Sequence, residues 1–167
     1  MMKYKFLDVY IFLIFIFICI FINFFTNNNK IWNNKIISFE LNGETTNKTI
    51  LDIYSFSHFY SGIILNIITN NNLFITLIIS ILFEYIENSN FGIKKYRSKK
   101  KYKNYKGDSF VNILSDIILL QIGFHLSNNI LSIKKKIFLI ILFEILLHPF
   151  HANLFNTIFK NVFTKYQ

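Results

Sequence analysis

KGDSFVNILSDIILL (residues 106–120) combines a strongly apolar segment with a regular row of polar side chains. Asp108, Asn112 and Asp116 recur at every fourth residue, so on a helix they turn through only about 80° and form one stripe. A carboxylate at the middle of a membrane helix costs about 2.5 to 3.5 kcal/mol even on lenient insertion scales. The stripe therefore predicts a polar interior in an otherwise apolar protein.

The composition is typical of a membrane protein. Of the 167 residues, 53% are hydrophobic and 21 are Phe, which is more apolar side chain than a soluble domain of this size can bury. Five stretches approach the roughly 17 to 25 residues with which a helix crosses about 30 Å of hydrocarbon. We therefore predict an all-α membrane protein, a compact bundle of about five transmembrane helices. These are residues 7–25, 53–69, 73–87, 109–127 and 137–159.

The chain is expected to form a single integral membrane domain over residues 1–167. The first helix (7–25) follows two lysines and is not followed by a small-residue cleavage site, which indicates a retained anchor. A polar, Asn-rich loop (26–52) comes next, in which residues 36–41 are predicted to form a short strand or an interfacial segment. Residues 53–159 are expected to form a four-helix unit with a polar cleft.

The distribution of basic residues indicates the orientation. With the amino terminus outside, 13 of the 18 Lys and Arg residues fall on the inner side, eight of them in the loop 94–106. The positive-inside rule favours this arrangement. The lysine run of that loop is interpreted as a cytoplasmic loop, and no nucleic-acid partner is expected.

Antiparallel succession of the helices brings their polar ends to one membrane face. His58 lies in the first turns of the second segment, and Glu84 and Glu87 close the third on a shared helical face. Asp108 and Asp116 open the fourth. These five residues are our candidate catalytic residues. Glu144, His148 and His151 share one face of the fifth segment, and Gly62 is expected to allow close approach of another helix.

Three motifs carry a resemblance to a known family. SHFYSGIIL, LFEYIENSNFGIKKYR and YKGDSFVNILSDIILLQIGF, in this order, resemble an uncharacterised family of small multi-pass bacterial inner-membrane proteins over about residues 52–126. More distantly, the pattern is similar to VanZ-like membrane proteins, in which a His, a Glu, and an Asp with an Asn recur on successive helices. The resemblance implies a multi-pass protein of the bacterial inner membrane. HANLFN (151–156) departs from the family pattern, and the family has no established activity to transfer.

The resemblance also implies further site residues near the carboxylates. Tyr96 and Arg97, with the neighbouring lysines, are suited to an anionic lipid head group. The expected substrate-binding residues are Asn88, Tyr96, Arg97, Ser109 and Asn112.

Three functions remain open from the residues themselves. The acids and His58 could hold a divalent metal, or act as acid and base on a lipid-borne substrate at the bilayer surface. Carboxylates alone suit Mg²⁺ or Mn²⁺, and a set with histidine suits Zn²⁺. The same groups could form an ion, proton or small-solute pathway, or they could fix helix packing in a structural or assembly protein.

Overall fold

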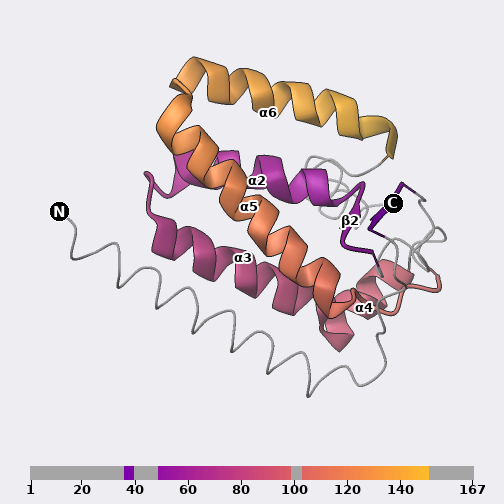
Figure 1. The fold of residues 1–167 in the computed structure, drawn as a ribbon. Coiled ribbons are helices and arrows are strands. Elements are labelled where there is room, and N and C mark those ends of the chain that lie inside the picture. The colour runs from indigo at the N-terminus through magenta and orange to yellow at the C-terminus, as the bar shows by residue number, and fades with distance from the viewer. Residues whose placement is uncertain (1–35, 40–48, 99–102, 151–167) are drawn as a thin grey trace, which may run out of the picture.

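The computed structural model describes residues 36–39, 49–98 and 103–150, and these ranges are mostly helical (Figure 1). Two short strands, β1 (Ile37–Ser38) and β2 (Leu51–Asp52), pair in parallel. The helices are α2 (Ser55–Ile68), α3 (Leu73–Asn88), α4 (Asn90–Arg97), α5 (Phe110–Ile130) and α6 (Ile133–Leu147), followed by the 3-10 turn η3 (His148–Phe150). The predicted first helix (7–25) and the end of the fifth lie outside the described residues.

Helix α5 is the centre of the bundle. It packs against α2 and α3, while α6 covers the other side of α2 (Figure 1). A Cβ atom added to Gly62 would overlap with the carbonyl oxygen of Leu120, and one added to Gly123 would overlap with that of Phe59. The two helices therefore meet backbone to backbone, and only glycine fits at either position. The close approach predicted at Gly62 is confirmed.

Short polar residues fix where the helices begin. The side chains of Asn72, Ser89 and Ser109 each accept a hydrogen bond from a backbone N–H three residues later, at the starts of α3, α4 and α5. Gly107 has φ 85°, a left-handed conformation that suits a residue without Cβ. This turn delivers Asp108 and the cap Ser109 to the start of α5.

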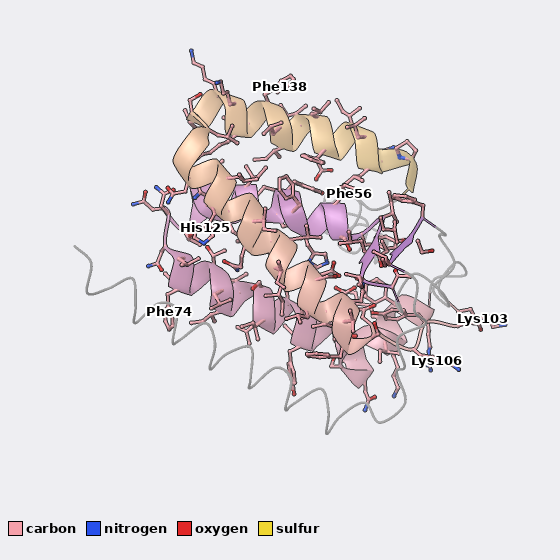
Figure 2. All side chains as sticks on the ribbon, in the orientation of Figure 1. Phe56, Phe74, Lys103, Lys106, His125 and Phe138 are labelled. Atoms are coloured by element: carbon pink, nitrogen blue, oxygen red, sulfur yellow. The ribbon has the colours of Figure 1, made fainter. Side chains whose placement is uncertain are left out.

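The described part of the chain buries polar groups and exposes apolar ones. Its buried set contains ten hydrophobic and sixteen polar or charged residues. Phe74 and Phe138 are 47% and 64% exposed and lie on the outer faces of α3 and α6 (Figure 2). This distribution is the reverse of that in a water-soluble domain, where large apolar side chains form the interior.

Helix lengths only partly match the predicted spans. Among the described helices, α5 alone is long and apolar enough to cross a membrane, over Phe110–Asn128. Helices α3 and α4 meet this test only together, and they are bent by 62° at the break between them. Helix α2 has 14 residues and is therefore roughly 21 Å long. A mostly helical fold is confirmed, and the five-span bundle stays a prediction.

One prediction about the shorter elements is confirmed, and two need adjustment. Residues 36–41 do contribute a strand, β1. Helix α4 was missed, because its basic residues were interpreted as the beginning of a loop. The predicted fifth segment began at residue 137, whereas α6 already begins at Ile133, and its regular helix ends at Leu147, two residues before Pro149.

Candidate functional site

His58 lies between carboxylates from two other helices. Its Nδ1 is 3.4 Å from Glu84 Oε1 on α3, and its Nε2 is 3.6 Å from Asp116 Oδ2 on α5. All three side chains are almost fully buried, with 11%, 5% and 5% of their surface exposed. Glu87 lies one turn after Glu84 on the same helix. We refer to His58, Glu84, Glu87 and Asp116 as the acid–histidine cluster.

Glu84 carries a buried acceptor without a donor. Its Oε1 has no hydrogen-bond partner among the described residues, because the 3.4 Å contact to His58 lacks hydrogen-bond geometry. Its Oε2 is 3.5 Å from Asn88 Nδ2, which is a long contact. A buried carboxylate oxygen in this position is costly unless a cation or a proton donor reaches it.

Three members of the cluster have the spacing of metal ligands. One ligand atom each from His58, Glu84 and Glu87 lies within 4.8 Å of the others. Metal bonds to histidine nitrogen and carboxylate oxygen measure about 2.0 to 2.2 Å, so ligand atoms on opposite sides of an ion are about 4 Å apart. Small side-chain rotations would therefore close this set around one ion.

A serine of α2 holds the side chain of Asp116 in place. Ser55 Oγ donates to Asp116 Oδ1 at 2.7 Å and accepts from the backbone N–H of Asp52 at 3.1 Å. This fixed carboxylate faces the second nitrogen of His58. A metal-bound histidine usually directs its other ring N–H to a carboxylate, which sets the tautomer and the ring orientation.

Asp52 belongs to the same buried region and was missed from the sequence. Its Oδ1 accepts from the backbone N–H groups of Tyr54 and Ser55 at 2.7 and 3.0 Å, and its Oδ2 lies 3.5 Å from Asn112 Nδ2. Burial, and then the charge of Asp108, raises the pKa of Asp52 to about 7, although the two backbone N–H groups oppose this. The D-x-x-S pattern before a helix is the signal that could have identified it.

Asp108 connects α5 to the loop and to α3. It accepts from Tyr105 Oη at 3.0 Å, and its backbone N–H donates to Asn88 Oδ1 at 2.6 Å. Asn88 Nδ2 in turn donates to the carbonyl oxygen of Glu84 at 3.1 Å. Burial, and then the nearby charge of Asp108, raises the pKa of the Tyr105 hydroxyl well above its usual value, so it stays a proton donor.

Of the five predicted substrate-binding residues, Asn88 forms hydrogen bonds with Asp108 and Glu84, and the other four fall into two groups. Asn112 and Ser109 are 1% exposed, and Ser109 caps α5 by accepting from the backbone N–H of Asn112. Tyr96 and Arg97 lie nearer the surface beside Tyr105: the Tyr96 ring is 5.0 Å from the Tyr105 ring, and Arg97 Nε donates to the Tyr105 carbonyl at 2.6 Å. Only the second group is placed to meet a molecule from outside.

The polar residues of the fifth segment lie apart from the cluster. Glu144 accepts from Tyr60 Oη at 2.9 Å, and Tyr60 follows His58 by two residues and so points to the opposite side of α2. His148 begins η3, and His151 lies outside the described residues. His125 is near the other end of α5 (Figure 2). Glu144 therefore faces Tyr60 rather than His58, while the predicted convergence of the polar helix ends at one membrane face stays a prediction.

Fold and geometry together define a helical protein with a buried centre of carboxylates around one histidine. The chain belongs to the family described as "Protein of unknown function (DUF2585)", whose profile matches residues 26–162. It is similar to a "UPF0314 protein" of Brucella anthropi, with 37% identity over 68 residues, which is 41% of this chain and 34% of that protein. The match thus spans about a third of the relative's length. No solved structure matches. Membership of an uncharacterised family is confirmed, and the distant VanZ-like similarity stays a prediction.

Proposed function

We propose that this chain is a multi-pass protein of the bacterial inner membrane with a metal-dependent centre. The acid–histidine cluster binds a divalent cation and performs acid/base chemistry on the polar head of a lipid-borne substrate. The membrane location is supported by the apolar outer faces of α3 and α6 over a polar interior. We also propose that the chain crosses the membrane five times and that it is distantly similar to VanZ-like membrane proteins.

One observation carries the metal assignment. Glu84 Oε1 is buried, faces His58 and has no hydrogen-bond partner among the described residues. Within those residues, the ion pairs of Glu84 and of Asp116 are both formed with this same histidine. A bound divalent cation would give Glu84 Oε1 the partner that it lacks and would bring the neighbouring carboxyl groups together as ligands.

The geometry suggests a role for each group. His58 Nδ1, Glu84 and Glu87 are the ligands, while Asp116, 3.6 Å from His58 Nε2, would accept its N–H and so act as a positioning residue. Two carboxylates with one imidazole suit Mn²⁺ or Zn²⁺. Such an ion polarises a bound phosphoryl or carbonyl oxygen. The paired Tyr105 and Asp108, 3.0 Å apart, are available to give and take a proton.

Metal analysis of the detergent-purified full chain tests the proposal. Wild-type protein loaded with Mn²⁺ or Zn²⁺ and then desalted should retain a stoichiometric amount, and Glu84→Gln should lose it. Glu144→Gln is the matched control, because this carboxyl lies on the other side of α2 and contacts Tyr60. A wild type that retains neither ion, or a Glu84→Gln variant that retains as much as wild type, would contradict the proposal.

A second function, passage of a proton or small solute, is favoured by one further feature. Thr76 and Ser80 continue the Glu84 face of α3 at one-turn intervals, and both are buried. Gln121 of α5 reaches Ser80 with its Nε2 at 3.5 Å, while its Oε1 is buried without a hydrogen-bond partner among the described residues. Proton flux into liposomes by metal-free protein, abolished in Gln121→Leu, would support this function. Absence of flux would reject it.

A further inference from the structure

Five basic side chains lie at the end of the bundle where α5 begins. Lys103 and Lys106 project from this end beside α4 (Figure 2), and the basic side chains of α4 are also exposed. We refer to the exposed residues Lys94, Lys95, Arg97, Lys103 and Lys106 as the basic end. We propose that the basic end binds the phosphate head group of an anionic phospholipid in the inner leaflet. This inference rests on the proposed membrane location and names the substrate class for the same site.

Helix α4 has the properties of an interfacial helix. It is bent by 62° from α3, its sequence NFGIKKYR contains no acidic residue, and Lys94, Lys95 and Arg97 lie in its last turn. Phe91, near its start, is 69% exposed. A short helix that presents an aromatic ring together with basic side chains is suited to the boundary between acyl chains and anionic head groups.

Arg97 is already oriented for an anion. Its Nε donates to the carbonyl oxygen of Tyr105 at 2.6 Å, which holds the guanidinium against the loop while the residue as a whole stays exposed. No other hydrogen bond of Arg97 is found within the described residues. The remaining N–H groups form a planar fork that matches two phosphate oxygens.

A continuous hydrogen-bonded path connects this arginine to the acid–histidine cluster. Tyr105, which accepts from Arg97 through its carbonyl oxygen, donates its hydroxyl to Asp108. The backbone N–H of Asp108 donates to Asn88, and Asn88 donates to the carbonyl oxygen of Glu84. A phosphate held by Arg97 would thus lie at the outer end of the network whose inner end is the proposed metal site.

The positive charge of the basic end and the anionic lipids of the inner leaflet both favour binding of a phospholipid. The basic end contains loop residues that the positive-inside rule places on the cytoplasmic side, and the inner leaflet presents anionic head groups there. Phe91 lies three residues before Lys94, and Ile86 and Phe83 precede it on α3; all three are exposed. A free phosphate ion would gain nothing from these apolar neighbours, and the aliphatic Ile86 offers a nucleic-acid base no ring to stack on, whereas a phospholipid brings acyl chains to cover them.

Lipid binding by the delipidated full chain in a neutral detergent tests the inference. Short-chain phosphatidylglycerol and phosphatidylcholine are titrated while the melting midpoint is followed, and native mass spectrometry counts bound lipid. We expect phosphatidylglycerol to bind at least about tenfold more tightly than phosphatidylcholine. The triple variant Lys94→Gln, Lys95→Gln, Arg97→Gln should lose this preference. The control Lys134→Gln, Lys135→Gln, with exposed lysines at the start of α6, should keep it.

Each other outcome overturns the inference. It fails if both lipids bind equally, or if the α6 control loses the preference as strongly as the α4 variant. If inorganic phosphate alone displaces phosphatidylglycerol, the ligand of the basic end is a free anion and not a lipid. If a single-stranded oligonucleotide displaces it, the ligand is a nucleic acid. Arg97→Lys, which keeps the charge and removes the fork, should weaken phosphatidylglycerol binding even if the triple variant fails to fold. Bound metal is measured in parallel, so loss of the metal centre and loss of lipid preference are distinguished.

Discussion

Substitution of Asp116 by Asn gives the sharpest test of how the metal site is organised. The change keeps the shape of the side chain but removes the ionisable carboxyl group that lies 3.6 Å from His58 Nε2. Asp116 does not belong to the group of proposed ligands, so it acts on the metal only through the imidazole. Loss of such a supporting carboxylate typically costs 10- to 100-fold in metal affinity, or about 1.4 to 2.7 kcal/mol.

The affinity is measured by titration calorimetry of the detergent-solubilised protein with Mn²⁺ and Zn²⁺. Asp116→Asn should weaken binding by about 10- to 100-fold. Ser55→Ala, which removes the 2.7 Å hydrogen bond to Asp116, should have a smaller effect in the same direction. Glu84→Gln should weaken binding more than either, because it alters a direct ligand. Unchanged affinity in Asp116→Asn, with normal binding by the wild type, would refute the relay from Asp116 through His58 to the ion.

Three further predictions concern the scaffold. Gly123→Ala should force α2 and α5 apart at the Phe59 carbonyl and lower the free energy of unfolding by about 1 to 3 kcal/mol. The control Ile122→Ala, on the exposed face of α5, should not force the helices apart, and chemical unfolding in detergent compares the two variants. Ser109→Ala should lower the same free energy by about 1 kcal/mol, because α5 loses its cap. Burial raises the pKa of Asp52 in the folded protein to about 7 from its ordinary 3.8, so Asp52 stabilises the fold most when it is protonated. Stability should therefore fall as pH rises from about 4 to 7, by up to about 4 kcal/mol, and melting curves of Asp52→Asn should show a weaker fall.

Local periodicity was sufficient to predict the stripe on α5. Residues four apart share a helical face, and Asn112 and Asp116 are indeed buried toward α2, where they meet Asp52, Ser55 and His58. The start of α2, the end of α3 and the start of α5 meet around His58, as antiparallel succession of these helices predicted.

Nonlocal contacts decided what the sequence could not predict. Asp52 enters the site because β2 pairs with β1 and the chain then turns into α2, and neither pairing nor turn has a periodic signal. Glu144 is predicted only to lie at the same membrane face as the cluster. The direction in which α6 faces is set by packing against Tyr60 rather than by spacing along the chain.

The chemistry of individual residues explains the remaining differences. Ser109 caps α5, a role that short hydroxyl side chains often have at the residue that precedes a helix, and its part in substrate binding stays a prediction. The role of the candidate catalytic residues stays a prediction, since proximity alone does not show what the cluster does.

A crystal structure of the Mn²⁺-loaded protein, measured at the manganese absorption edge, tests the central claim most directly. The account predicts one strong anomalous peak at bonding distance, about 2.0 to 2.2 Å, from His58 Nδ1 and from carboxylate oxygens of Glu84 and Glu87. Asp116 should then accept a hydrogen bond from Nε2 of the same imidazole. A structure without a peak among these three side chains, with Glu84 instead hydrogen-bonded to His58 alone, would contradict the account.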